Sequence, residues 1–246
     1  MNEHPRFYCS TTLVPGMTIS LPAPAVRHAL VRRLQAGDAV TLFNGHGGEF
    51  VARINDLTRD TAIAYVEEAV DREVEPPYSV LLAQALTSSE KMDWTIEKAV
   101  ELGATAIVPL TSERSVIRLS GDRAQRRHVH WSGIIQAACE QSGRNTMPSL
   151  SPLLGTREFI ESHTGRLKLL ASPRARAPLA DVLRQNDAPP ENRSVTLLIG
   201  PEGGFADVEE AFAIEHGFAP VSLGPRVLRT ESAGPAALAI VHAIWG

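Results

Sequence analysis

The residues best suited to chemistry lie in a loop near the carboxyl end of the chain. Residues 197–205, LLIGPEGGF, pass from an apolar run into a glycine-rich turn and then toward a helix. Ligands of parallel α/β proteins bind at the carboxyl ends of strands, and glycines let the backbone approach a ligand closely. The loop matches neither the P-loop motif nor the G-x-G-x-x-G dinucleotide motif. It therefore indicates a ligand site of another kind, with a plain strand-to-helix turn as the alternative.

A second loop of the same type follows the next strand. Residues 222–233, SLGPRVLRTESA, again leave a strand and enter a helix. Two such loops after two strands can form the two walls of one pocket. Arg229 and Glu231 would then lie at its mouth, and a simple surface ion pair between them is the alternative interpretation.

The elements that position these loops alternate between strands and helices. Strands are predicted at residues 79–85, 106–110, 168–171, 195–199 and 220–223. Helices are predicted to end at Leu102 and His216 and to cover about 122–142 and 235–245. Cap patterns at residues 87–90 and at Asp207 with Glu210 precede two of these helices, and Gly103 ends the first. This alternation predicts an α/β fold with a parallel sheet covered on both faces.

Residues 1–72 have a different pattern, in which short strands alternate with glycine turns. A helix is expected at 23–34 and strands at 39–43, 49–54 and 61–67, with hairpin turns at 44–45 and 47–48. This meander predicts a small barrel. The charged and then proline-rich residues 71–77 predict a linker. We therefore expect one domain at 1–72 and a second at 73–246.

The composition of the chain excludes several classes of protein. Its 246 residues carry a formal net charge of −4, which does not by itself indicate nucleic-acid binding. All but three of the 24 basic residues are arginines, which suit phosphates and base edges, although a coding bias explains this equally well. No apolar run predicts a membrane span, and the start MNEHPRFYCS lacks a secretion signal. We expect a cytoplasmic protein.

The cysteines and histidines predict no metal site. Cys9 and Cys139 lie far apart and lack C-x-x-C spacing, so we interpret them as buried, inert thiols. One disulfide or a catalytic Cys–His pair is the alternative. The histidines also lack ligand spacing.

The two loops, IGPEGGF and LGPRVLRTESA, resemble the signature of the RsmE family, which belongs to the SPOUT (knotted) RNA methyltransferases. Three further segments agree with it in the same order: Arg6-Phe7-Tyr8, KMDWTIEKAVELG at 91–103 and CEQSGRN at 139–145. Together the segments span nearly the whole chain. One departure is Ser232, where the family commonly has threonine, and this change keeps the hydroxyl.

The resemblance implies a small PUA-like β-barrel followed by an α/β SPOUT domain with a deep trefoil knot. It also implies a homodimer that uses S-adenosylmethionine to methylate N3 of a uridine in 16S ribosomal RNA, free or in the small ribosomal subunit. Apolar Leu198, Leu223 and Leu228 would sandwich the adenine ring. The implied cofactor-binding residues are Leu198, Gly200, Glu202, Gly203, Gly204, Ser222, Leu223, Gly224, Val227, Leu228 and Arg229.

The implied reaction requires a base, because uracil N3 carries a proton at neutral pH. Our hypothesis is that Glu231, or a group it orients, accepts this proton. Arg229, Arg6 or Arg144 would stabilise the uracil anion. Because N3 lies on the Watson–Crick edge, the target must be unpaired or flipped out. Arginines expected to contact RNA are Arg6, Arg27, Arg32, Arg33, Arg114 and Arg118, and for all of them except Arg6 a solvated helix surface is the alternative.

Two other functions remain open from the sequence. One is a transfer-RNA ribose methyltransferase of the same superfamily, against which the amino-terminal barrel and the RTESA segment argue. The other is a non-catalytic ribosome-assembly protein that binds RNA, against which the intact cofactor loops argue.

Overall fold

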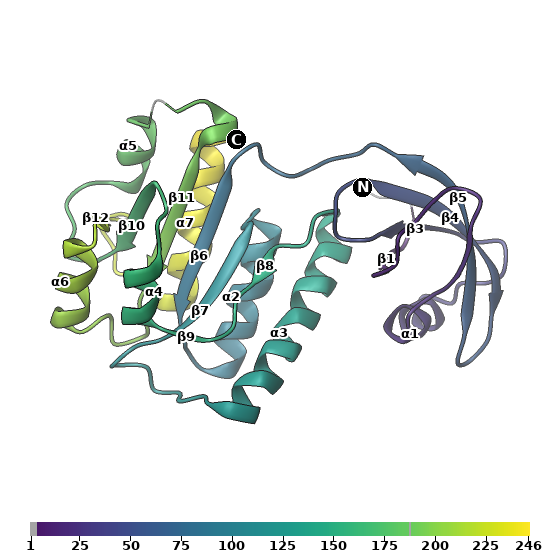
Figure 1. Ribbon diagram of the computed structural model, residues 1–246, viewed down its shortest axis with the longest axis horizontal. Coiled ribbons are helices and arrows are strands. Elements are labelled where there is room, and N and C mark those ends of the chain that lie inside the picture. Colours follow the sequence, from purple (N-terminus) through teal and green to yellow (C-terminus); the bar gives the residue numbers. More distant parts are fainter. Residues whose placement is uncertain (1–3, 187) are drawn as a thin grey trace. The chain divides into compact units, whose positions relative to one another are not determined.

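The computed structural model describes residues 4–186 and 188–246, which form two compact units (Figure 1). Unit 1 comprises residues up to Glu75 together with Cys139–Met147, and unit 2 comprises Pro76–Ala138 and Pro148–Gly246. The sequence placed residues 139–147 with the second domain, whereas in the structure they pack with unit 1.

Unit 1 is built on a five-stranded sheet with the order β1-β3-β4-β5-β2. Strand β1 is parallel to β3, and the other pairs are antiparallel. Alternate residues of β4 and β5 are buried, such as Ile54, Ala64 and Val66, because successive side chains of a strand point to opposite faces. The elements are β1 (Arg6–Tyr8), β2 (Thr18–Ser20), α1 (Ala23–Val31), β3 (Ala39–Phe43), β4 (Glu49–Leu57) and β5 (Ala62–Val70).

Helix α1 ends three residues earlier than the sequence predicts. Arg33 adopts a φ of 57°, in the left-handed region that ends helices. The amides of Arg33 and Leu34 donate to the carbonyls of Leu30 and Ala29, so the last turn is closed by backbone hydrogen bonds. The end of the helix is therefore set by a non-glycine residue that gives no stop signal in the sequence.

Unit 2 contains a parallel sheet with the order β12-β10-β11-β6-β7-β8, and β9 also pairs with β7. Its strands are β6 (Ser79–Ala85), β7 (Ala106–Thr111), β8 (Ser149–Leu150), β9 (Leu154–Gly155), β10 (Leu167–Ala171), β11 (Ser194–Ile199) and β12 (Ala219–Val221). The central strands β6 and β11 are apolar and almost wholly buried, as expected for strands covered on both faces. The α/β fold class is therefore confirmed.

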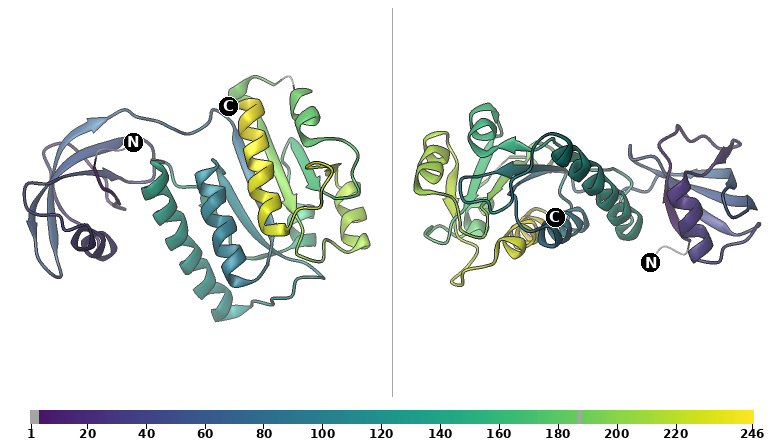
Figure 2. Two further views of the ribbon diagram at one scale, coloured as in Figure 1. Left: turned by 180° about the vertical axis from the view of Figure 1, so that it is seen from behind. Right: turned by 90° about the horizontal axis from the view of Figure 1, so that it is seen from below.

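Helices cover both faces of this sheet, with α2 and α7 side by side on one face and α4 and α6 on the other (Figures 1 and 2). The helices are α2 (Ser89–Glu101), α3 (Gly121–Ser142), α4 (Thr156–Ser162), α5 (Leu179–Arg184), α6 (Asp207–Glu215) and α7 (Thr230–Trp245), with a 3-10 turn at Pro190–Asn192. The last turn of α3 belongs to unit 1. Within the described residues, no helix has both the length and the apolar character needed to cross a membrane.

Two predicted helix starts were wrong. Helix α7 begins at Thr230 and contains Pro235, which the sequence analysis took as its first residue because proline favours helix starts. At α6 the side chain of Glu209, not of Asp207 or Glu210, accepts a hydrogen bond from the Ala206 amide, at 2.9 Å. The cap pattern was therefore real but assigned to the wrong carboxylates.

Candidate functional site

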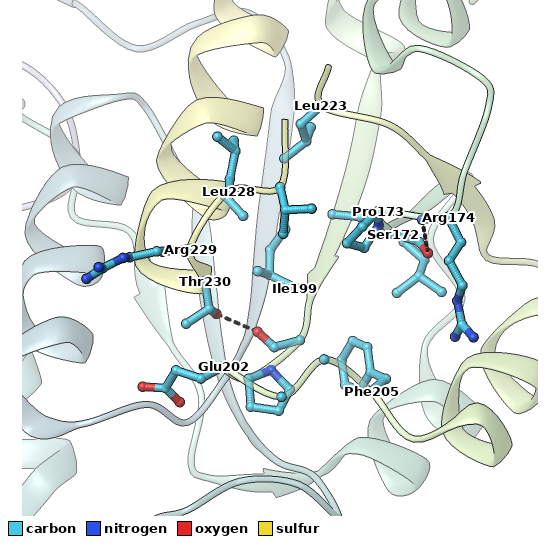
Figure 3. A pocket seen from close by; sticks show the side chains of 18 of the residues that line it. Ser172, Pro173, Arg174, Ile199, Glu202, Phe205, Leu223, Leu228, Arg229 and Thr230 are labelled. Atoms are coloured by element: carbon cyan, nitrogen blue, oxygen red, sulfur yellow. Dashed lines mark hydrogen bonds between the residues drawn. The ribbon is translucent and has the colours of Figure 1, made fainter. Parts of the chain in front are cut away.

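A cavity of about 530 Å³ opens in unit 2 where β10, β11 and β12 end (Figure 3). Three loops line it, drawn from residues 170–174, 199–205 and 222–231, and Lys91, Arg114, Asp207, Glu210 and Ala233 complete its wall. Sites of this volume commonly hold small molecules and cofactors. The two loops that the sequence analysis singled out therefore do form walls of one pocket.

The first loop, residues 200–205, is shaped by its glycines. A Cβ on Gly200 would lie 3.1 Å from the Phe205 amide nitrogen and 3.2 Å from the Phe205 ring, so the turn closes only over glycine. Gly204 has a φ of +66°, and its amide donates to the Pro201 carbonyl at 2.9 Å. Arg114 supports the loop from outside, because its Nη1 donates to the carbonyls of Gly203 and Phe205 at 3.2 and 3.3 Å.

The second loop is anchored at Ser222. Its amide donates to the Ala177 carbonyl at 2.8 Å, and its carbonyl accepts from the Leu179 amide at 3.0 Å. Its hydroxyl accepts from the amide of Gly224, where φ is +125°. Farther along, Leu223 and Leu228 lie near Ile199 at the opening of the cavity (Figure 3). These apolar side chains suit a flat aromatic ring.

A hydrogen-bonded chain joins the two loops through the core. Gln84 Nε2 on β6 donates to Thr230 Oγ1 at 3.1 Å, and Thr230 Oγ1 donates to the Gly200 carbonyl. Figure 3 shows this last hydrogen bond as a dashed line. Gly234 lets α7 pack close to β6, because a Cβ at this position would lie only 3.1 Å from Gln84 Oε1. The sequence analysis missed this network, since Gln84 lies within an apolar strand far from both loops.

The segment 170–174, at the end of β10, forms the third wall of the cavity. It was not predicted from the sequence. Ser172 Oγ donates to Glu210 Oε1 at 2.9 Å, and Arg174 pairs with Asp207 at 3.0 Å and with Glu210. The available signal was the polar sequence Ser172-Pro173-Arg174 directly after an apolar strand. Glu210 therefore connects the loop after β10 to α6 and does not cap that helix.

Four charged side chains meet at the mouth of the pocket. Lys91 Nζ lies 3.3 Å from Glu202 Oε1 and 3.5 Å from Glu231 Oε1. Arg229 Nη1 lies 4.0 Å from the same Glu231 oxygen, with 82% of its side chain exposed against 15% for Glu231. Glu231 Oε2 is buried and has no hydrogen-bond partner among the described residues. Arg229 and Glu231 thus both line the pocket, as predicted, and they also form the ion pair that was the alternative interpretation.

All but one of the residues expected to bind cofactor line this cavity. The exception is Leu198, which is fully buried in the hydrophobic core of unit 2 while its neighbour Ile199 lines the cavity. Adjacent residues of a strand point to opposite faces, so the side chain of Ile199, and not that of Leu198, faces the cavity. The cavity-lining residues expected from the sequence are Gly200, Glu202, Gly203, Gly204, Ser222, Leu223, Gly224, Val227, Leu228 and Arg229.

Arg6 and Arg144 belong to unit 1, where both are buried and paired. Arg6 pairs with Glu49 and donates to the Arg144 carbonyl at 3.1 Å and to Asn145 Oδ1. Arg144 Nε donates to Glu75 Oε1 at 2.8 Å, and its Nη2 pairs with the second oxygen. We call Arg6, Glu49, Glu75, Arg144 and Asn145 the clasp. It holds residues 139–147 against the strands of unit 1.

The arginines expected to contact RNA lie on different surfaces of the two units. Arg27, Arg32 and Arg33 are exposed on or just after α1. Arg114 and Arg118 lie in the segment before α3 and not on a helix. Arg118 is exposed and donates to the Glu113 carbonyl at 3.2 Å.

Both cysteines are free and buried. Burial raises the pKa of each thiol to about 12. The interpretation as buried thiols is therefore confirmed. Within residues 4–186 and 188–246, no group of three or more His, Cys, Asp or Glu side chains is arranged to hold a metal ion.

Known protein families match segments of both units. A family model described as an RNA methyltransferase domain matches residues 74–242, and one described as an RNA methyltransferase PUA domain matches residues 21–67. The fold and site thus define the class of RNA methyltransferases that carry a PUA domain.

Individual relatives narrow this class. Ribosomal RNA small subunit methyltransferase E from Synechocystis is 38% identical over 87% of this chain and 69% of its own length. The protein of the same name from Buchnera aphidicola (Schizaphis graminum) is 31% identical over 98% and 97%. The chain belongs to the ribosomal RNA small subunit methyltransferase E family, which confirms the resemblance seen in the sequence.

Solved structures of similar proteins agree. The ribosomal RNA small subunit methyltransferase E from Neisseria gonorrhoeae, bound to S-adenosyl methionine, has a TM-score of 0.90 at 38% identity and covers 99% of this chain and 98% of its own. A putative methyltransferase from Legionella pneumophila in complex with the same cofactor has a TM-score of 0.91 at 34% identity, with 98% of both chains covered.

Proposed function

We propose that this protein transfers the methyl group of S-adenosylmethionine to N3 of a uridine in 16S ribosomal RNA. The observation that carries the proposal is the cavity at the ends of β10, β11 and β12, lined by ten of the residues that the family resemblance implies for the cofactor. The similar structures from Neisseria gonorrhoeae and Legionella pneumophila hold this cofactor.

The residues present fit the cofactor. Ile199, Leu223 and Leu228 offer an apolar surface to an adenine ring, and Gly203 and Gly204 expose their backbone to the cavity. Ser172 and Arg174 add polar groups on the third wall. When bound, S-adenosylmethionine supplies an electrophilic methyl group on its sulfonium. The chain itself must then bind the uridine and remove the N3 proton.

Glu231 is the group best placed to take this proton. Its Oε2 is buried without a partner, so a donor such as N3–H would complete its hydrogen bonding. The exposed Arg229 guanidinium can donate to a uracil oxygen while negative charge develops there. Since N3 lies on the Watson–Crick edge, the uridine must enter the mouth unpaired.

Unit 1 is proposed to contribute RNA binding. The exposed side chains of Arg27, Arg32 and Arg33 supply positive charge for phosphates. Arg114 and Arg118 are proposed to add contacts from unit 2, and Arg6 and Arg144 keep the role in RNA or anion binding that the resemblance implies. We further propose that residues 1–72 and 73–246 act as RNA-binding and catalytic domains of a cytoplasmic homodimer.

The function is tested with small ribosomal subunits from a strain that lacks this protein. Incubation with the purified protein and S-adenosylmethionine should add one methyl group, and mass spectrometry should place it on N3 of a uridine. A methyl group on a ribose would support a ribose methyltransferase instead. An absence of methyl transfer and of cofactor binding by calorimetry would support an assembly protein.

The RNA-binding role is tested by salt dependence. Replacing Arg27, Arg32 and Arg33 together by Gln should weaken RNA binding and lower the slope of log affinity against log salt, by roughly 0.7–0.9 for each lost phosphate contact. Replacing Arg184, an exposed arginine of α5 that pairs with Asp181, serves as the control. An unchanged slope in the triple variant would remove these arginines from the interface.

A further inference from the structure

Lys91 is a charged side chain of the pocket that no step above uses. It lies in the first turn of α2 and lines the cavity, with 33% of its side chain exposed. Its carbonyl accepts a hydrogen bond from Thr95 at 2.8 Å, and the neighbouring Met92 and Ile96 are fully buried. The start of the lysine side chain is therefore fixed by a well-packed helix.

We propose that Lys91 is a positioning residue for methyl transfer, which holds one carboxylate oxygen of Glu231 and leaves the other free for the substrate. The inference rests on the proposed function, in which Glu231 removes the N3 proton. Lys91 approaches Oε1 of Glu231 at 3.5 Å, while Oε2 is the atom that lacks a partner. One oxygen is thus held by the protein and the other is left for a ligand.

The charges around Glu231 show why a cation is needed there. Lys91 from α2 and Arg229 at the start of α7 are the positive groups that face it, and Glu202 from the first loop shares Lys91 with it. Two neighbouring carboxylates disfavour each other's ionised form. An ammonium between them offsets this repulsion and allows Glu202 and Glu231 to lie on either side of it. Without it, the two carboxylates would repel each other, and the free oxygen of Glu231 would no longer be held toward the substrate.

Lys91 is better suited to this role than Arg229. Arg229 reaches Glu231 only at 4.0 Å, and water screens its largely exposed side chain. Lys91 is closer to Glu231 and also contacts Glu202, so it links the first loop to α7. Arg229 is thereby left free to meet the RNA.

The test compares Lys91→Met and Lys91→Arg with Lys98→Met in the full-length protein. Lys98 lies on the same helix and pairs with Glu97 and Glu101 outside the pocket, which makes it a matched control. The measurements are cofactor affinity by calorimetry, KM for unmethylated small subunits and kcat across pH. Thermal unfolding checks the fold, and Lys91→Gln replaces Lys91→Met if the latter does not fold.

In Lys91→Met we expect kcat at pH 7 to fall by about 10- to 100-fold, within the range of general-base effects. Cofactor affinity and KM should change less than about threefold. The loss of kcat should persist across the pH range, because the oxygen of Glu231 is misplaced at every pH. Lys91→Arg should restore most of kcat, and Lys98→Met should match the wild type.

Two results would overturn the inference. One is a kcat of Lys91→Met that matches that of the wild type across pH. The other is a Lys91→Arg variant as defective as Lys91→Met. If instead the wild-type protein neither binds S-adenosylmethionine nor methylates subunits, the proposed function itself fails, and the inference with it.

Discussion

The clasp of unit 1 and the mouth of the pocket in unit 2 both bring together opposite charges, but they differ in how these are buried and paired. In the clasp, Arg6 meets Glu49, and Arg144 meets both oxygens of Glu75. The clasp atom without a hydrogen-bond partner is Nε of Arg6, whose guanidinium lies over the Phe43 ring at 5.0 Å. At the mouth, a buried carboxylate oxygen of Glu231 has no partner.

This difference separates two uses of the same residue types. Buried charges that are paired and hydrogen-bonded with each other stabilise an arrangement of the chain, whereas a buried carboxylate oxygen without a donor is available to a ligand. On this basis we expect the clasp to stabilise unit 1, beside the role in RNA or anion binding proposed for Arg6 and Arg144, and the mouth to act on the substrate. Residue types and family resemblance alone did not separate Arg6 and Arg144 from Arg229 and Glu231.

The largest effect should follow Glu231→Gln, which keeps the shape of the side chain but removes its capacity to accept a proton. We expect kcat to fall by about 10²–10⁴-fold, with cofactor affinity little changed. Single-turnover methylation of small subunits measures the rate of methyl transfer, and calorimetry measures cofactor affinity. Near-normal turnover would show that the unpaired oxygen of Glu231 has no role in the reaction. The mouth of the pocket would then not differ from the clasp in function.

Arg144→Met should act mainly on stability. It leaves Glu75 buried without its partner, and breaking a buried pair in this way costs about 3–5 kcal/mol. Urea unfolding measures this change, while cofactor affinity at low temperature should stay the same. A variant as stable as the wild type that has lost only kcat would give Arg144 the catalytic role that the resemblance implies.

Thr230→Val tests the link between the two loops. It removes the hydroxyl that donates to Gly200 and accepts from Gln84, and an unsatisfied buried group costs about 1–3 kcal/mol. We expect cofactor affinity to fall by roughly tenfold, because the two loops are no longer held in position relative to each other. The exposed Thr164 gives a control, Thr164→Val. Equal affinities in the two variants would show that the network does not position the pocket.

The smallest effect concerns the thiols of unit 1. Because burial raises the pKa of Cys9 and Cys139 from 9.0 to about 12, the thiolate fraction at pH 8 is lower than in the unfolded chain by about 10³-fold. Alkylation by iodoacetamide should be slow in the native protein and fast in urea. The raised pKa also means that stability is lost as pH rises from about 9 toward 12. Rapid native labelling of either thiol would show that unit 1 opens readily.

Strands β6, β7, β10, β11 and β12 of unit 2 could be predicted because they are apolar runs bounded by glycine, proline or polar residues. The short helices α4 and α5 and the strands β2, β8 and β9 gave too few residues for a periodic signal. The cofactor loops were predicted from glycine spacing and family resemblance. The side of β11 that faces the cavity was not, since Leu198 and Ile199 are equally apolar and only the pairing of the strand decides between them.

Contacts between distant residues account for most of the rest. Gln84 is separated from Thr230 by most of unit 2, and Arg6 from Asn145 by much of the chain. The sequence around Gln84 or Arg6 does not indicate which distant residue it contacts. The pairing of Lys91 with two carboxylates from different segments has the same origin.

The assignment of residues 139–147 to unit 1 has a consequence for biosynthesis. When the ribosome has made Glu75, the clasp still lacks Arg144 and Asn145, so Arg6, Glu49 and Glu75 have no complete set of partners. At about 5–20 residues per second, the intervening chain takes on the order of several seconds to emerge. The amino-terminal sheet must therefore wait for a later segment before its folding is complete, and a fragment cut at Glu75 would remain in that unfinished state.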